Sequence, residues 1–374
     1  MRVLHVISTL APTGAGQQLR LLTRHLPHDC EVVTLSGPGP VAEALRAAGT
    51  PVHELAAPGD YDPGTVGRLR RLIRRGGFDV VHTHLYRACV LGRVAARLAG
   101  VPHVVATEHG PDVLGSRAAY LATERLGRAT IAVSPAIAGH LRAWGVPDAR
   151  ISVIPRAVDT ADFRYDPALR TAARARLGIP AAVPVIGAVG RLEPGHRFDR
   201  LIRATAEVPG AVLLLVGDGP ARSALTRLAA IEGIAGRVKF AGPVEHTREM
   251  LCAMDVFASP SDQEPDGLLV LEALAAGLPA LYVRCPPLEE RAAARAAVPG
   301  TRRLTAHDPE SLPRALRAEV LCVDERRGAR LPVRDAGSRY DARRLAAAVD
   351  RVYQRVTVRP HRSAAYHFRT RGVA

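Results

Sequence analysis

The chain is 374 residues long and 47% hydrophobic, which predicts two or three domains with full-sized cores. With 51 Lys and Arg against 36 Asp and Glu, its net charge is +15, so we expect its partners to be acidic. Aromatic residues make up only 4% of the chain and are not interleaved with a basic motif, which argues against a specific nucleic-acid binder.

The chain opens as a strand, a glycine-containing turn and a helix. Val3–Ser8 reads V-L-H-V-I-S, the apolar run of a buried parallel strand. The turn spans Pro12–Gly16 and includes Gly14 and Gly16. The helix that follows has apolar residues on one face, at Leu19, Leu22 and Leu26. This order is typical of the start of a Rossmann-like domain.

The segment Gly64–Arg75 is predicted to form a basic amphipathic helix. Its apolar residues fall on one side, at Val66, Leu69, Leu72 and Ile73. Its arginines occupy the rest of the surface: Arg68, Arg70, Arg71, Arg74 and Arg75. Two interpretations stay open, a solvated face over a packed stripe and peripheral contact with an anionic membrane.

Further strands of the first half are predicted at Phe78–His84, Pro102–Gly110 and Ala129–Ser134, with helices at Ala88–Ala99 and Pro135–Trp144. His82 and His84 stand at the end of the first of these strands, where two histidines could suggest a metal site. No third ligand is spaced nearby along the sequence. We therefore predict that no metal binds, and that the two histidines face a cleft or cap the strand.

The second half repeats this alternation, with strands predicted at Val185–Gly190, Val212–Val216, Val238–Phe240 and Asp255–Ala258. Strands alternating with helices indicate a parallel sheet with right-handed crossovers. After Leu281–Pro287 the pattern weakens, and the segment to Ala336 stays unassigned. We expect an α/β fold with Rossmann-like domains at residues 1–165 and 166–340, a last helix at 341–356, and a disordered basic tail at 357–374.

The stretch Ser259–Pro279 carries the strongest functional signal. Two carboxylates, Glu264 and Glu272, bracket a Gly-Leu-Leu turn that leads into a helix. Gly267 lets a ligand approach the backbone closely, and the N–H groups of Leu268 and Leu269 belong to the first helical turn. Such a helix start suits an anion, most naturally a phosphate, and Glu272 could reach a ribose diol.

This stretch resembles the Glu-x7-Glu signature of retaining glycosyltransferases of family 4, which have the GT-B fold. The resemblance covers most of residues 1–285 and the last helix. It implies two Rossmann-like parallel-sheet domains that face each other across a cleft, with the last helix crossing back to the first domain. It also implies that Glu272 holds the donor ribose and that Glu264 contacts the donor sugar.

The same resemblance assigns roles elsewhere in the chain. His109, in the matching Thr-Glu-His-Gly segment, would lie beside the donor sugar and help to stabilise the transition state. Gly14 and Gly16 correspond to the acceptor loop, although the carboxylate usual in that motif is missing. Gly217 and Arg222 follow Val212–Val216 in a loop that we assign to donor binding.

Three further departures from the family pattern affect the expected site. Arg156 and Ala157 replace the Asn and Gly of the segment Ile151–Phe163, which should alter the loop before the hinge. Asp266 places an extra carboxylate near the donor, where it would recognise an amino or hydroxyl group of the donor or acceptor.

The third departure concerns the charge of the leaving diphosphate, which the protein must stabilise if no metal is present. The family uses Gly-Arg-Leu-x-x-x-Lys-Gly. Here Arg191 matches the arginine, whereas His196 stands at the lysine and Arg197 at the last glycine. Three interpretations stay open: His196 acts as a part-time cation, Arg197 takes over, or the site is impaired.

We expect a metal-independent, retaining hexosyltransferase without cofactors, working by same-face attack assisted by the leaving phosphate. The donor would be a UDP- or GDP-sugar. The acceptor would be a hydroxyl of a lipid-linked or exopolysaccharide intermediate, or of a small specialised metabolite. The alternative is a catalytically impaired GT-B protein that binds nucleotide-sugar or a partner without turnover.

The sequence also bears on location. Five scattered cysteines without a C-x-x-C pair indicate reduced thiols, and Met1–Leu10 is too short for a signal peptide. No apolar run reaches the roughly 20 residues that a bilayer requires. We expect a cytoplasmic protein, with peripheral contact at the inner face of the membrane through Gly64–Arg75 left open.

Overall fold

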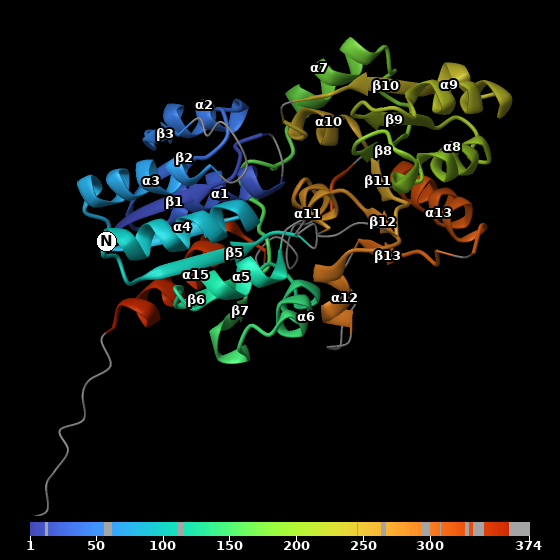
Figure 1. Cartoon of the computed structure of the whole chain (residues 1–374). Helices are drawn as coiled ribbons and strands as arrows, with labels where there is room; N and C mark the ends of the chain where they lie inside the picture. The colour runs from blue at the N-terminus through green and yellow to red at the C-terminus, as the bar shows by residue number, and fades with distance from the viewer. Residues whose placement is uncertain are drawn as a thin grey trace, which may run out of the picture.

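The computed structural model describes residues 1–11, 14–55, 62–110, 116–244, 246–262, 267–292, 300–306, 308–325, 329–331 and 340–358. It contains two α/β units, each built on one parallel sheet (Figure 1). The expected fold class, α/β with two Rossmann-like parallel-sheet units, is confirmed.

The first sheet has seven strands in the order β3-β2-β1-β4-β5-β6-β7. Successive residues of a strand point to opposite faces, so Val3 packs with Leu22 of α1 whereas Leu4 packs with Leu69 of α3. Helices thus cover both faces, which explains the continuous apolar character of the strand. The elements are β1 (Arg2–Ile7), α1 (Gly14–His25), β2 (Asp29–Thr34), α2 (Pro40–Ala47), β3 (Val52–Glu54), α3 (Pro63–Gly76), β4 (Val80–His84), α4 (Tyr86–Ala99), β5 (Val104–Glu108), α5 (Arg117–Glu124), β6 (Ala129–Ala132), α6 (Pro135–Trp144) and β7 (Ile151–Val153).

The second sheet has six strands in the order β10-β9-β8-β11-β12-β13. In β11, Val256 packs with Leu316 of α13 and Phe257 packs with Leu271 of α11, so this sheet is also covered on both faces. The elements are α7 (Pro167–Leu177), β8 (Val185–Val189), α8 (Phe198–Ala206), β9 (Val212–Val216), α9 (Arg222–Ile231), β10 (Val238–Gly242), α10 (Arg248–Ala253), β11 (Val256–Ser259), α11 (Leu268–Ala275), β12 (Ala280–Tyr282), α12 (Pro286–Ala292), β13 (Thr301–Arg303) and α13 (Ser311–Glu325).

The last helix, α15 (Ala342–Thr357), returns to the first unit, as expected. Its Val349 and Val352 belong to the same buried cluster as Val3 of β1. Where the chain passes between the units, the Val158 amide donates to the Tyr340 oxygen at 2.7 Å, and the Ala342 amide donates to the Val158 oxygen at 3.2 Å. The outgoing and returning segments therefore run side by side.

Among the described residues, β13 and α13 lie wholly in the segment that the sequence left unassigned, and α12 lies mostly in it. β13 adds an edge strand beside β12, and α13 buries four apolar side chains along one face. These residues are spaced three or four apart, as a helix requires: Leu312, Leu316, Val320 and Val323. The pattern was present in the sequence but was obscured by Pro313 and by the exposed arginines between the apolar positions.

Two further observations concern membrane crossing and the cysteines. No helix in the described ranges combines the length and the apolar character that a bilayer crossing needs. All five cysteines are free thiols, of which only Cys322 is exposed. The expected basic tail lies outside the described residues from position 359 onward.

Candidate active site

His109 follows the carboxyl end of β5, the edge at which open α/β sheets bind ligands. Only 7% of its surface is exposed. Its backbone oxygen accepts a 2.6 Å hydrogen bond from Nη2 of Arg156, and its Nε2 lies 3.2 Å from Nδ1 of His84. Burial, together with the nearby charge of Arg156, lowers the pKa of His109 to about 3. The ring is therefore uncharged at neutral pH. One of its two nitrogens carries a proton and donates a hydrogen bond, and the other accepts one.

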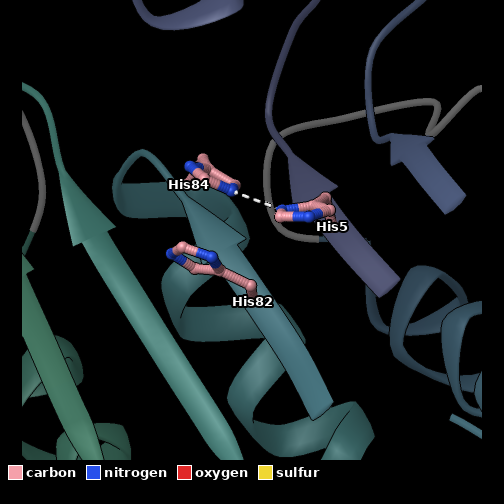
Figure 2. A group of neighbouring side chains, drawn as sticks. All are labelled: His5, His82 and His84. Carbon is pink, nitrogen blue, oxygen red and sulfur yellow. Dashed lines mark hydrogen bonds between the residues drawn. The ribbon is translucent and has the colours of Figure 1, made fainter. Parts of the chain in front are cut away.

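Four imidazoles meet around this position. His5 of β1 lies in register with His82 of β4, and side chains two residues apart share a face of the sheet, so His84 joins them (Figure 2). One nitrogen from each of these three rings lies within 4.8 Å of the others. Spacing along the sequence reveals only His82 and His84, because the pairing of strands is not visible there. The expectation that no metal binds stays a prediction.

His82 differs from its expected place, because it neither faces a cleft nor caps its strand. Its side chain is fully buried beneath α15, with Nδ1 2.6 Å from the hydroxyl of Tyr353 and Nε2 2.7 Å from the hydroxyl of Thr107. A cavity of about 30 Å³, with room for roughly one water molecule, lies nearby and is lined in part by His84, Thr107 and His109.

The two glycines assigned to the acceptor loop lie at the start of α1. Gly14 is its first residue, and Gly16 is buried in its first turn. A Cβ at Gly16 would come within 2.9 Å of the Ala11 oxygen, so the helix starts tight against the chain that leaves β1. A role of Gly14 and Gly16 toward an acceptor stays a prediction.

In the second unit, two glycines bring the loops after β8 and β9 together. Gly217 has a φ of +129°, and a Cβ there would lie 2.0 Å from the oxygen of Gly190. The Gly190 amide donates to the Val216 oxygen at 2.9 Å. Only glycine permits this approach at Gly217, which places the segment Gly190–Arg197 at the carboxyl edge of the sheet.

The three groups expected to meet the diphosphate have different surroundings. Arg191 is exposed and forms an ion pair with Glu193. Arg197 has a φ of +54° and forms an ion pair with Asp199 at 3.3 Å. His196 stacks on Phe198 with ring centroids 5.8 Å apart, and its buried Nδ1 has no hydrogen-bond partner among the described residues. Of the three, His196 is the one whose side chain is not engaged by a carboxylate.

Arg222 begins α9 and lies close to the same edge. Its guanidinium is 3.6 Å from the carboxylate of Asp218 and lies over the ring of Phe240, 5.5 Å from its centroid. These contacts hold the side chain next to the loop that contains Gly217. Its contact with a donor stays a prediction.

The helix α11 begins and ends where the sequence predicted. Gly267 precedes it with a φ of +64°, and a Cβ there would lie 2.5 Å from Sγ of Cys285. Leu268 and Leu269 form its first turn, and Gly277 follows its end with a φ of +72°. Glu272 accepts a 2.8 Å hydrogen bond from the hydroxyl of Thr247. The two other acidic residues of the predicted site, Glu264 and Asp266, lie outside the described residues.

The predicted residues thus form two groups. His109, Gly14 and Gly16 follow strands of the first sheet at its carboxyl edge. The second group stands at the carboxyl edge of the second sheet: Arg191, His196, Arg197, Gly217, Arg222, Gly267, Leu268, Leu269 and Glu272. Sequence reasoning missed three residues that support these groups: His5, Thr247 and Tyr353. Arg156 was noticed only as a departure, whereas it holds the backbone of His109.

Two family models match the chain. The model of glycosyltransferase family 4 matches residues 12–162, and that of glycosyl transferases group 1 matches residues 183–319. The lipopolysaccharide core biosynthesis glycosyltransferase LpsE of Rhizobium meliloti is 44% identical over 111 residues, which are 30% of this chain and 33% of that protein. The D-inositol 3-phosphate glycosyltransferase of Mycobacterium tuberculosis is 33% identical over 227 residues, which are 54% of this chain and 46% of that protein. The matches thus span a third to a half of these relatives.

Solved structures agree in fold. Anabaena Alr3699/HepE in complex with UDP superposes with a TM-score of 0.79 at 20% identity, covering 95% of this chain and 100% of that one. WaaG, a glycosyltransferase involved in lipopolysaccharide biosynthesis, superposes with a TM-score of 0.59 at 20% identity, covering 95% and 98%. The likeness to these structures shows the GT-B fold, and the two family models, which together match most of the chain, show that it belongs to glycosyltransferase family 4.

Proposed function

We propose that this protein is a retaining glycosyltransferase that moves a sugar from a nucleotide-sugar to a hydroxyl acceptor without a metal. The observation that carries the proposal is the start of α11. There Gly267, in a conformation that favours glycine, opens the first turn of a helix, and the carboxylate of Glu272 is held by Thr247 one turn later. A helix start with a fixed carboxylate suits a phosphate next to a ribose.

A uridine nucleotide is the donor that we favour. Three of the similar structures are of HepE in complex with UDP, with UDP and glucose, and with UDP-glucose. In this chain the phosphates would lie at the first turn of α11, with the ribose hydroxyls at Glu272. Glu264 would contact the sugar, and Asp266 would contribute to its selection.

His196 is the residue that we propose in the role of the usual lysine. Arg197 is engaged by Asp199 and Arg191 by Glu193, whereas Nδ1 of His196 has no hydrogen-bond partner in the part of the chain that the structure describes. A protonated His196 would stabilise the charge that develops on the leaving diphosphate. His109 would contribute as a neutral hydrogen-bonding group beside the sugar, because burial keeps it uncharged.

The acceptor that we propose is carried on an anionic lipid or polysaccharide intermediate. Arg71, Arg74 and Arg75 of α3 are exposed, and Arg70 of the same helix donates to the oxygen of Leu98 at the end of α4. The neighbouring end of α4 borders a hollow of about 260 Å³ that four arginines line: Arg97, Arg125, Arg128 and Arg150. Exposed arginines of this kind would attract an anionic membrane.

A second candidate is a protein that binds nucleotide-sugar without turnover. It is favoured by the pairing of Arg191 with Glu193 and of Arg197 with Asp199, because these ion pairs offset the positive charge that the reaction needs. Both candidates predict nucleotide binding. They differ in whether donor is consumed.

The test is calorimetric titration of the full chain with UDP, GDP, TDP and ADP in the presence of EDTA. We expect one nucleotide to bind, and Glu272→Ala and Thr247→Ala to weaken its binding at least tenfold. Thr171→Ala is the matched control, because Thr171 is an exposed residue of α7 whose hydroxyl bonds only within its helix. If no nucleotide bound at millimolar concentration, both candidates would be wrong.

Turnover then separates the two candidates. Slow hydrolysis of the bound nucleotide-sugar indicates an active enzyme even before the acceptor is known. The release of nucleoside diphosphate measures this hydrolysis. We expect His196→Ala to lower this rate at least tenfold and Arg197→Ala to lower it less than threefold. Binding without any hydrolysis or transfer would favour the second candidate.

A further inference from the structure

Three buried imidazoles form a row that ends at His109. Nδ1 of His5 lies 3.1 Å from Nε2 of His84, and Nδ1 of His84 lies 3.2 Å from Nε2 of His109. The exposed fractions of the three side chains are 0%, 1% and 7%. At the two ends of the row, Nε2 of His5 and Nδ1 of His109 have no hydrogen-bond partner among the described residues.

The bonding of such a row restricts where its protons can be. A neutral imidazole carries one N–H, and each of the two contacts needs one N–H and one bare nitrogen. If His84 carries its proton on Nδ1, it donates to His109 and must accept from His5. If it carries its proton on Nε2, it donates to His5 and must accept from His109. In the first arrangement all three rings are protonated on Nδ1, and in the second all three are protonated on Nε2.

Protonation does not remove this restriction, because the rings of the row carry no extra proton near neutral pH. Burial lowers the pKa of His5 to about 3 and that of His84 well below its ordinary value, so both rings are neutral near pH 7. Other charged or titratable groups that act on the row are Arg156, His28 and His82, and each of them further lowers a pKa in the row. The row therefore holds three protons on six nitrogens.

Two other observations indicate that His84 is held in place. Leu85, the next residue, has φ +69° and ψ 153°, a backbone conformation that is found almost only at glycine. The ring of His82 lies against that of His84 with centroids 4.2 Å apart, and both nitrogens of His82 are engaged by Tyr353 and Thr107. The position of His84 is thus fixed from its backbone and from one face.

We propose that His84 and His5 are positioning residues that lock the ring of His109 and make its tautomer the same as their own. Nδ1 of His109 is then a donor only when His5 and His84 are also protonated on Nδ1, and an acceptor only when they are protonated on Nε2. The hydrogen-bonding character that His109 offers to a ligand is in this way tied to His84, its direct partner, and through His84 to the tautomer of His5. The consequence for catalysis rests on the proposed function, whereas the shared tautomer does not.

A metal ion is the competing explanation for the cluster of His5, His82 and His84. A structural zinc site takes four ligands. Both nitrogens of His82 already bond to hydroxyl groups, so His82 could bind an ion only by losing Tyr353 or Thr107. His5 and His84 alone would offer two ligands, and the nitrogens concerned already face each other at hydrogen-bond distance.

The test is nitrogen NMR of the full chain labelled with ¹⁵N-histidine, at pH 7.5 and without nucleotide. Long-range proton–nitrogen correlations distinguish the two neutral tautomers, and single substitutions assign the signals. We expect His5, His84 and His109 to show one common tautomer. Different tautomers in the three rings, or a stoichiometric transition metal found by mass spectrometry of the purified protein, would overturn the proposal.

A matched pair of variants tests the coupling, because the two amides imitate different nitrogens of histidine. His84→Asn keeps a polar group near the position of Nδ1 and so keeps the contact with His109. His84→Gln keeps one near Nε2 and so keeps the contact with His5. We expect the signal of His109 to become a mixture of tautomers in His84→Gln, with His140→Gln on α6 as the unaffected control.

Activity gives a separate readout. If the proposed function holds, His84→Gln is expected to lower kcat at least tenfold with the KM for donor changed less than threefold, and His84→Asn to lower kcat less than threefold. Equal losses in the two variants would indicate a packing role only. If neither variant nor the wild type turns over, the proposed function fails while the tautomer measurement still decides the inference.

Discussion

At the scale of single residues, Arg156 takes on a task that the sequence did not reveal. It stands where the family motif that the sequence resembles has asparagine, and it is buried with its Nη2 bonded to the backbone oxygen of His109. A long cation reaches this oxygen from the segment that leads out of the first unit. The departure from the family pattern thus supplies a support for His109.

Replacing Arg156 with alanine is expected to destabilise the protein by about 1–3 kcal/mol, because a buried carbonyl loses its charged donor. Arg142→Ala is the control, since its ion pair with Asp148 is exposed and should contribute less than about 0.5 kcal/mol. Urea unfolding monitored by circular dichroism measures both. Equal effects of the two substitutions would contradict the role given to Arg156.

The buried histidines make the stability of the first unit depend on pH. Burial lowers the pKa values of His5, His82, His84 and His109 from an ordinary value of 6.5, those of His5 and His109 to about 3. The unfolded chain therefore binds more protons than the folded chain between about pH 6.5 and pH 3. The stability that these groups contribute is present above pH 6.5 and is lost as the pH falls.

We expect each of these histidines to lower the free energy of unfolding by about 1.4 kcal/mol at pH 5.5. This pH lies one unit below the ordinary pKa of 6.5, so the side chain is protonated in the unfolded chain but not in the folded one. Urea unfolding at pH 7.5, 6.5 and 5.5 measures the total. His5→Phe should make the dependence shallower by roughly the share of one histidine. A free energy of unfolding that stayed constant over this range would mean that the imidazoles are not buried in solution.

At the scale of the elements, most of the fold could be predicted from apolar runs and helical spacing. Strand β9 and helix α6 have the predicted bounds, and α11 starts at Leu268 after Gly267 as expected. What was missed had a local cause: α13 was not assigned because arginines fill its exposed face. In the site, residues carried by a motif could be named, whereas His5, Thr247 and Tyr353 could not, because only tertiary packing brings them in.

The start of α11 allows a prediction for one glycine. In Gly267→Ala, the added methyl group would meet Sγ of Cys285 and the residue would keep a φ of +64°, so the first turn of the helix must shift. We expect nucleotide binding to weaken at least tenfold in calorimetry. Gly233→Ala is the control, because Gly233 has a φ of +71° but its Cβ would meet nothing within 4 Å. A normal affinity for nucleotide in Gly267→Ala would place the donor elsewhere.

At the scale of the whole molecule, the net charge of +15 is partly concentrated on the exposed arginines of α3. Each arginine near an anionic bilayer contributes about 1 kcal/mol, and salt screens this attraction. We expect the protein to sediment with phosphatidylglycerol vesicles at low salt. It should be released at about 0.5 M salt, because the Debye length is then only a few ångströms and the charges are screened from each other.

The variant that tests this surface is Arg71→Glu/Arg74→Glu/Arg75→Glu, which should lower vesicle binding at least tenfold. A control with the same net charge is Arg227→Glu/Arg302→Glu/Arg314→Glu, on exposed positions of the second unit. If both triple variants lost binding equally, overall charge and not α3 would be responsible. Nucleotide affinity should be unchanged in both.

The return of α15 to the first unit also has a consequence for the order in which the chain is made. Tyr353, which bonds to His82, follows it by 271 residues. At a synthesis rate of roughly 5–20 residues per second, the ribosome delivers Tyr353 about 14–54 seconds after His82. Until then the apolar face formed by Val3, Leu22 and Val80 lacks its cover. The unit whose strands emerge first is therefore the one whose folding is completed last.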